Sequence, residues 1–238
     1  MDPLHKISKI AGAGYLVIFI SGIFANFFVL ESLVVPDDAK ATATNIMDNG
    51  QQFRIGILSF IVMVIFDVLL SWALYILLKP VNKDVSLLTA WLRLVNATIF
   101  GVALYHLFAV LHILSGADYL AVFDAGELQA KVMLSLDAFN ATWLVGLVFF
   151  GLHLFFLGYL ILKSSYIPGV IGVLLMVASL GYLTDSFAHF LLPNYNNYKT
   201  LFMSMVIVPG VIGELSFTFW LLFKGVRGPG QQNPVTVG

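Results

Sequence analysis

Six long apolar stretches constrain this chain more than any other feature of its sequence. A helix that crosses the hydrocarbon core of a bilayer needs about 20 mainly apolar residues, and each stretch reaches that length. Charges or helix breakers bound every stretch, and no connection between them is long enough to form a soluble domain. The stretches run roughly over Ile7–Leu33, Phe53–Leu78, Val85–Leu114, Val132–Leu162, Ile167–Leu192 and Leu201–Phe223.

The composition agrees with a chain that lies mostly within a membrane. Of the 238 residues, 60% are hydrophobic and 11% are charged, whereas a soluble domain has about 45–50% apolar and about 25% charged residues. We therefore predict an all-α membrane protein in which residues 1–227 form a single bundle of six transmembrane helices. Residues 228–238 are expected to form a flexible C-terminal tail, and the protein is expected to be a multi-pass protein of the inner, or plasma, membrane.

Charge and cysteine content exclude several classes of function. The formal net charge is −1, which argues against a nucleic-acid partner, because such a partner demands a basic surface. The chain has no cysteine, so disulfides, cysteine-ligated zinc, iron–sulfur clusters and a thiol nucleophile are excluded. The expected partner is the lipid bilayer itself.

Lysines and arginines flank the apolar stretches unequally. Seven lie on one side of the predicted bundle and four on the other, and the richer side of a membrane protein faces the cytoplasm. We therefore expect both termini to be cytoplasmic. The richer side would hold Lys6, Lys9, Lys79, Lys83, Lys163, Lys224 and Arg227, and the poorer side Lys40, Arg54, Lys131 and Lys199.

Short segments along nearly the whole chain carry a family pattern. They are Ala43-Thr44-Asn45-Ile46, Phe53-Arg54-Ile55-Gly56, Leu74-Tyr75 with Lys79-Pro80-Val81-Asn82, Phe150-Gly151-Leu152-His153 with Gly158-Tyr159-Leu160, Gly181-Tyr182-Leu183 with Asp185-Ser186, Gly213-Glu214, and Trp220-Leu221-Leu222 with Lys224-Gly225-Val226. Through these segments the chain resembles a bacterial six-helix membrane family, domain of unknown function 4386. The resemblance implies the fold and carries no established activity.

Four ionisable residues are predicted to lie near the middle of the membrane. Asp67 precedes Lys79 by twelve residues, and His153 and Glu214 each precede the lysine at the end of their own stretch by ten. At about 1.5 Å per residue these positions are roughly 15–18 Å from the helix ends, and Arg93 begins about 12 Å in. A charge in mid-bilayer costs roughly 2.5–3.5 kcal/mol, so we expect all four side chains to face the bundle interior.

This mid-depth group has two interpretations. It can be a structural ion-pair network that joins four helices, or it can be a ligand-binding or proton-binding site. Pro209, Gly210 and Gly213 interrupt the last stretch just before Glu214, and interrupted helices mark binding sites in many transporters. The function favoured by the sequence is the binding of a small or lipid-like ligand, with proton linkage. Six spans are few for a transporter monomer, which is compatible with a homo-oligomer.

A second group of ionisable residues lies nearer the outer ends of the spans. His106, Asp137, Asp185 and His189 have side chains that zinc accepts, and Asp185 and His189 share a helix face because they are four residues apart. The alternative function is therefore a metal-dependent intramembrane hydrolase that acts on a lipid. The simpler interpretation is that residues near the rim need only water or headgroups. The sequence leaves catalysis open.

Two smaller hypotheses complete the sequence-based view. His112 and His189 lie near one level, and two histidines from different helices can bind a b-type haem. Asp124 followed by Glu127 has the spacing of a capping box, so residues 124–131 are expected to be a helical lead-in to the fourth span.

Overall fold

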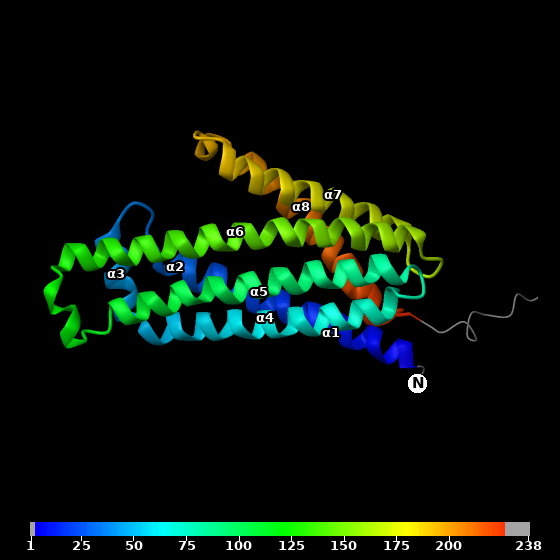
Figure 1. The fold of residues 1–238 in the computed structure, drawn as a ribbon, viewed down its shortest axis with the longest axis horizontal. Coiled ribbons are helices and arrows are strands. Elements are labelled where there is room, and N and C mark those ends of the chain that lie inside the picture. Colours follow the sequence, from blue (N-terminus) through cyan, green and yellow to red (C-terminus); the bar gives the residue numbers. More distant parts are fainter. Residues whose placement is uncertain (1–2, 227–238) are drawn as a thin grey trace, which may run out of the picture. The chain divides into compact units, whose positions relative to one another are not determined.

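The computed structural model describes residues 3–226, and all regular structure within that range is helical (Figure 1). Six helical segments are long and apolar enough to cross a membrane, which confirms the predicted fold class. Arg227 and the expected tail at 228–238 lie outside the described residues. The six segments are Pro3–Leu33, α4 (Gly50–Leu78), α5 (Lys83–Ile113), α6 (Ala125–Lys163), α7 (Gly169–Leu191) and α8 (Lys199–Phe223).

The first span is not a uniform α-helix. α1 (Pro3–Ile23) continues into a π-helical turn, η1 (Phe24–Leu30), and then into α2 (Glu31–Leu33). Within this turn the Phe28 carbonyl accepts hydrogen bonds from Ser32 Oγ at 2.9 Å and from Gln52 Nε2 of α4 at 2.7 Å. The π-helical turn lies within the stretch predicted as a single span over Ile7–Leu33. A π-turn widens the helix and redirects its carbonyls, and here a side chain of α4 bonds one of them.

Side-chain caps set the starts of two helices in the connections. Asp38 precedes α3 (Ala39–Asp48), and its carboxylate accepts from the Ala41 amide at 2.8 Å. At the start of α6, the Glu127 amide donates to Asp124 Oδ1 at 2.8 Å, and the Asp124 amide donates to Glu127 Oε2 at 3.0 Å. This reciprocal pair is a capping box. The predicted lead-in to the fourth span is therefore confirmed as the first turns of α6.

The chain divides into two compact units that interleave along the sequence. Unit 1 consists of Met1–Leu16, Asp67–Asn96 and Leu147–Gly238, and unit 2 consists of Val17–Phe66 and Ala97–Gly146. Helices α1, α4, α5 and α6 contribute residues to both units, whereas α7 and α8 belong to unit 1 alone. Each unit has its own core.

Close helix contacts hold unit 1 together. α7 and α8 lie side by side (Figure 1), and α6 meets α7 where Gly158 faces Gly172. A Cβ at Gly158 would lie 2.6 Å from the Gly172 carbonyl oxygen, so only glycine allows this approach. Small residues serve this purpose in membranes, where helix association depends on close packing because lipid supplies no hydrophobic driving force.

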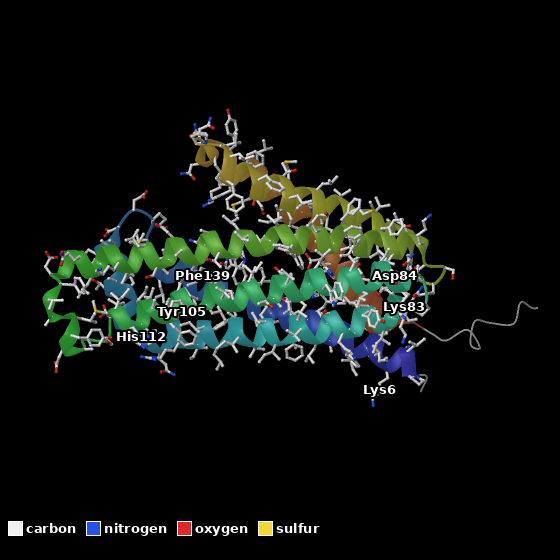
Figure 2. All side chains as sticks on the ribbon, viewed as in Figure 1. Lys6, Lys83, Asp84, Tyr105, His112 and Phe139 are labelled. Atoms are coloured by element: carbon white, nitrogen blue, oxygen red, sulfur yellow. The ribbon has the colours of Figure 1, made fainter. Side chains whose placement is uncertain are left out.

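One end of unit 1 is rich in lysine. Figure 2 shows Lys6 of α1 at the same end as Lys83 and Asp84 of α5. The end of α8 joins this region, because the Val226 amide donates to Ser8 Oγ at 3.2 Å. We call it the lysine-rich end; its exposed lysines are Lys6, Lys9, Lys79, Lys83, Lys163 and Lys224.

Aromatic side chains dominate the core of unit 2. Phe100 of α5 stacks on Trp143 of α6, with ring centroids 3.6 Å apart and planes inclined by 5°. Phe60 of α4 and Phe139 of α6 contact the same indole, with centroids 5.2 and 5.3 Å from it. Figure 2 labels Phe139 within this unit. Buried aromatic rings in such arrangements stabilise a core beyond the area they cover.

Candidate functional site

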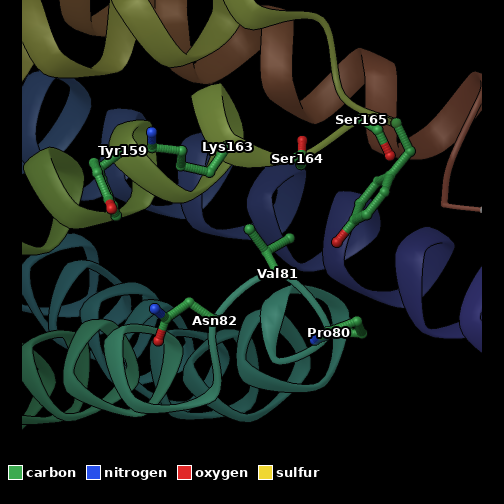
Figure 3. A pocket seen from close by; sticks show the side chains of 8 residues that line it. Pro80, Val81, Asn82, Tyr159, Lys163, Ser164 and Ser165 are labelled. Atoms are coloured by element: carbon green, nitrogen blue, oxygen red, sulfur yellow. The ribbon is translucent and has the colours of Figure 1, made fainter.

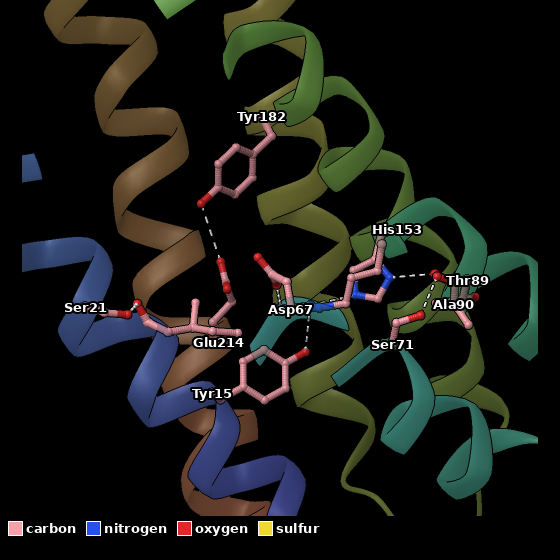
Figure 4. Close-up of polar contacts among 11 residues, drawn as sticks. Tyr15, Ser21, Asp67, Ser71, Thr89, Ala90, His153, Tyr182 and Glu214 are labelled. Atoms are coloured by element: carbon pink, nitrogen blue, oxygen red, sulfur yellow. Dashed lines mark hydrogen bonds and ion pairs between the residues drawn. The ribbon is translucent and has the colours of Figure 1, made fainter. Parts of the chain in front are cut away.

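A buried ion pair lies at the centre of unit 1. Arg93 of α5 donates from Nη2 to Asp67 Oδ1 of α4 at 2.5 Å, and both side chains are at most 3% exposed. Asp67 projects from the middle of α4 and Arg93 from the third turn of α5. The sequence placed these two residues near one depth, and the structure brings them into direct contact (Figure 4).

His153 of α6 extends this pair. Its Nε2 lies 3.1 Å from Arg93 Nη1, and its Nδ1 lies 2.9 Å from the Thr89 carbonyl oxygen of α5. Because a guanidinium can only donate, His153 Nε2 must accept, and the proton on Nδ1 then donates to Thr89. The arrangement therefore selects a neutral imidazole of one tautomer, with both nitrogens satisfied. His153 is fully buried.

Tyr15 of α1 closes the other side of the guanidinium. Arg93 Nη1 donates to the Tyr15 hydroxyl at 3.3 Å, and the Arg93 Cζ lies 5.0 Å from the centre of the Tyr15 ring. Phe150 of α6 also faces the guanidinium, at 5.7 Å. Aromatic faces attract a cation when water is excluded. Arg93 Nε is buried and has no hydrogen-bond partner within residues 3–226.

Glu214 of α8 lies beside this group without a cation of its own. Within the described residues, Arg93 and Asp67 are the one basic and acidic pair whose nitrogen and oxygen atoms lie within 4.0 Å of each other. Glu214 therefore has no such partner there. Glu214 is half-buried, and the Tyr182 hydroxyl of α7 donates to its Oε1 at 3.5 Å, a long and weak hydrogen bond. Figure 4 shows the Tyr182 hydroxyl directed at the Glu214 carboxyl group.

Proline and glycine interrupt the regular packing of the backbone near Glu214. Pro209 lies inside α8 and cannot donate a hydrogen bond to the Met205 carbonyl one turn earlier. Gly181 of α7 packs against that same carbonyl, so closely that a Cβ there would lie 2.2 Å from the oxygen. A Cβ at Gly210 would lie 3.5 Å from the Tyr182 hydroxyl and 3.8 Å from Glu214 Oε1. Gly210 therefore lies at ordinary contact distance from both groups that form the hydrogen bond between Tyr182 and Glu214.

We call this group the polar cluster of unit 1. One cation and one anion cancel within it, His153 is held neutral, and Glu214 is a second acid with a single weak donor. A carboxyl group in such surroundings either holds a proton or attracts a ligand with donor groups. The cluster receives a side chain from each of the six spans. Its members are Tyr15, Asp67, Arg93, His153, Tyr182 and Glu214.

Tyr15 and Tyr182 were not predicted from the sequence to belong to this cluster. Both lie well inside their spans, whereas tyrosines of membrane proteins concentrate at the interfaces. Their depth was therefore a signal that could have drawn attention to them. The hydrogen bond from His153 to the backbone carbonyl of residue 89 cannot be predicted from the sequence, because any residue at that position supplies the same oxygen.

The four candidate metal ligands are distributed differently. His106 and Asp137 belong to unit 2, whereas Asp185 and His189 belong to unit 1. Within residues 3–226 no three His, Asp or Glu side chains form a group that could hold a metal ion. The assignment of these four residues as metal ligands stays a prediction.

Each of these residues has a simpler environment. His106 Nε2 lies 3.4 Å from Thr142 Oγ1, and Asp137 is exposed. Asp185 accepts from the Tyr195 hydroxyl at 2.7 Å, and the exposed His189 packs its ring 4.4 Å from that of Tyr195. The hydrolase hypothesis stays a prediction.

His112, the other candidate haem ligand, is exposed, and its Nδ1 lies 2.8 Å from the Phe108 carbonyl oxygen within α5. The haem hypothesis likewise stays a prediction, as does a zinc cofactor.

The fold and the cluster define a class of protein. It is a multi-pass α-helical membrane protein whose spans enclose ionisable side chains. The particular family follows from comparison with known sequences: the chain belongs to the family described as domain of unknown function (DUF4386), which matches residues 10–225. This agrees with the resemblance seen in the sequence.

A similar curated protein extends the distribution of such chains. An uncharacterized protein of the archaeon Archaeoglobus fulgidus is 33% identical over 169 residues, which cover 71% of this chain and 83% of that protein. The resemblance seen in the sequence was to a bacterial family, whereas this relative is archaeal. Proteins of this kind are therefore not confined to bacteria. No solved structure matches the chain.

Proposed function

We propose that the polar cluster of unit 1 binds a small or lipid-like ligand inside the membrane and links this binding to a proton on Glu214. The observation that carries the proposal is the state of Glu214. It is the second acid of a cluster whose arginine is already paired with Asp67, and its one weak donor is Tyr182 at 3.5 Å.

The rest of the cluster supports a binding role more than a purely structural one. Asp67, Arg93 and His153 are buried and bonded to one another through Arg93. Glu214 and Tyr182 are half-buried and have unused hydrogen-bonding capacity. Ionisable groups within membrane spans commonly mark substrate or proton paths.

The lysine-rich end supports a proposed topology. Six exposed lysines gather at that end of unit 1, and basic flanks stay on the cytoplasmic side. We therefore propose that both termini face the cytoplasm, that the protein resides in the plasma membrane, and that residues 1–227 act as one transmembrane domain. Assembly as a homo-oligomer belongs to the same proposal.

Native mass spectrometry of the protein purified in mild detergent tests the ligand. We expect the wild-type protein to retain a co-purifying small or lipid-like molecule, and the variants Glu214→Gln and Tyr182→Phe to lose it. Glu31→Gln is the matched control, because Glu31 is an exposed glutamate of unit 2. Wild-type protein that carries no such molecule, or equal retention by all variants, would contradict the proposed binding.

Infrared difference spectroscopy tests the proton linkage separately. The carbonyl band of a protonated carboxyl group should change between ligand-bound and ligand-stripped protein. That change should disappear in Glu214→Gln and persist in Glu31→Gln. A band that does not respond to stripping would show that binding and protonation are independent.

A further inference from the structure

A pocket of about 400 Å³ lies at the lysine-rich end of unit 1. Figure 3 shows the side chains that line it. Lys163 lies ten residues beyond His153 on α6, or about 15 Å along the helix axis. The turn between α4 and α5 forms one wall, and the end of α6 with the following loop forms the other. The lining residues are Pro80, Val81, Asn82, Tyr159, Lys163, Ser164, Ser165 and Tyr166.

Hydrogen-bond donors without protein acceptors line this pocket. Within the described residues Lys163 Nζ has no acid within 4.0 Å, and its recorded neighbour is the Tyr159 ring at 5.9 Å. Asn82 Oδ1 accepts from the Val85 amide at 3.0 Å, which leaves the Nδ2 group of Asn82 to donate elsewhere. Ser165 is exposed. The lining contains no acidic residue.

Internal hydrogen bonds hold the walls of the pocket in place. The Tyr166 hydroxyl donates to the Leu77 carbonyl oxygen at 2.8 Å, which fastens the α6–α7 loop to the end of α4. Burial raises the pKa of Tyr166 to about 12, so this donor keeps its proton at physiological pH. Ser164 Oγ donates to the Ile161 carbonyl at 2.8 Å and accepts from the Ile167 amide at 3.3 Å. The pocket is therefore built before any ligand arrives.

The position and chemistry of the pocket point to one kind of ligand. Lys163 is the last residue of a membrane-spanning helix, so the pocket opens at the level of the lipid headgroups. The choice of ligand rests on the proposed topology, in which the lysine-rich end faces the cytoplasmic leaflet, where anionic lipids concentrate and basic residues attract them. We propose that this pocket binds the phosphate group of an anionic phospholipid, with Lys163, Asn82 and Ser165 as its donors. Pro80, Val81 and the Tyr159 ring supply apolar surface for the adjoining part of the lipid.

The experiment measures lipid retention by native mass spectrometry after incubation with vesicles of phosphatidylglycerol or of phosphatidylcholine. We expect the wild-type protein to retain phosphatidylglycerol in preference to phosphatidylcholine. Lys163→Ala and Asn82→Asp should each lower that retention roughly tenfold, because each removes one hydrogen-bond donor to a charged phosphate group. Asn82→Asp keeps the helix cap, removes the amide donor and adds a repelling charge.

Lys224→Ala is the matched control. Lys224 is exposed at the same end of unit 1 and follows an aromatic residue by four positions, as Lys163 does. Equal losses in Lys224→Ala and Lys163→Ala would overturn the proposal, since they would indicate general attraction to a charged surface. Equal retention of the two lipids by the wild-type protein would also overturn it.

A parallel measurement distinguishes a lipid headgroup from a free phosphate ester. Glycerol 3-phosphate, added at the same concentration, should not displace phosphatidylglycerol if the acyl chains contribute to binding. If glycerol 3-phosphate displaces phosphatidylglycerol from the wild-type protein but not from Lys163→Ala, the pocket binds phosphate and its ligand is a soluble ester, which would overturn the lipid assignment. Displacement that does not depend on Lys163 would count against the pocket.

Discussion

The two units differ sharply in what they bury, although α1, α4, α5 and α6 contribute to both. Unit 1 encloses a charged pair, a histidine and several hydroxyl groups, whereas unit 2 encloses stacked aromatic rings. Of the buried polar residues within the described part of the chain, Thr42 is the one that belongs to unit 2; the others all belong to unit 1. Within the described part of the chain, buried polar side chains are therefore concentrated in one unit.

This difference shows how a membrane helix can have two roles along its length. α5 presents Thr89 and Arg93 within unit 1 and Phe100 within unit 2. Buried polar groups need partners, so the part of α5 in unit 1 is bound to a specific set of neighbours. Aromatic packing in unit 2 depends on shape and tolerates replacement by other apolar residues of similar volume. Substitutions in unit 1 should therefore change both stability and ligand retention, whereas substitutions in the core of unit 2 should change stability alone.

The largest effect is expected from Arg93→Ala. This change leaves the buried carboxylate of Asp67 without its cation, and removal of one partner of a buried pair costs about 3–5 kcal/mol. Thermal unfolding of the purified protein in detergent measures the loss. Arg54→Ala in unit 2 is the control, because Arg54 is exposed and surface changes usually stay within about 0.5 kcal/mol.

A double variant sharpens this test. Replacing both members of the pair with apolar residues, as in Asp67→Leu with Arg93→Met, should recover much of the lost stability, because no charge is stranded. The same double variant should abolish retention of the co-purifying ligand. An Arg93→Ala variant as stable as Arg54→Ala would show that the pair is not a structural element of unit 1.

Phe100→Ala is the corresponding change in unit 2. It removes the ring that stacks on Trp143 at 3.6 Å. In soluble cores such truncations cost roughly 3–5 kcal/mol, and we expect somewhat less here because lipid supplies no hydrophobic driving force. Thermal unfolding should show the loss, while native mass spectrometry should show unchanged ligand retention. If Phe100→Ala also failed to retain the ligand, the two units would not differ in function as proposed.

Gly181→Ala should have a moderate effect on unit 1. The new Cβ would lie 2.2 Å from the Met205 carbonyl, so α7 and α8 must separate, and overpacking of this kind costs about 1–3 kcal/mol. Because Tyr182 is the next residue, ligand retention should fall as well. Gly101→Ala in unit 2 meets nothing within 4 Å and should be neutral or slightly stabilising. Equal unfolding temperatures for the two variants would refute the close contact.

The smallest effect is expected from Tyr166→Phe. Loss of the bond to the Leu77 carbonyl should lower stability by about 1 kcal/mol. Burial raises the pKa of Tyr166 to about 12 from 10.0 in the unfolded chain, so the folded state favours the protonated hydroxyl. The contribution of Tyr166 is therefore fully present below pH 10.0 and is lost as the pH rises towards 12. The stability difference between wild-type and variant protein, followed by unfolding temperature against pH, should shrink over that window.

Local sequence was sufficient to predict the spans and some of their ends. The six predicted stretches agree with the membrane-spanning helices, because hydropathy and breakers act within a few residues of each position. The capping box of Asp124 and Glu127 was predictable for the same reason. The π-turn of Phe24–Leu30 was not, since its carbonyl at Phe28 is bonded by Gln52 from another helix.

Tertiary structure decided which polar groups meet. Depth along the spans placed Asp67, Arg93, His153 and Glu214 near one level, yet depth alone does not distinguish Asp67 from Glu214 as the partner of Arg93. The choice depends on which helix faces pack together, and in a membrane helix nearly every face is apolar, so hydropathy carries little information about orientation. The same reason explains why the pocket of Lys163 and Asn82 could not be predicted from the sequence. One wall is the turn between α4 and α5, and the other is the end of α6 with the loop that follows it. Asn82 and Lys163 are more than eighty residues apart in sequence, so only the tertiary structure brings these two walls to one place.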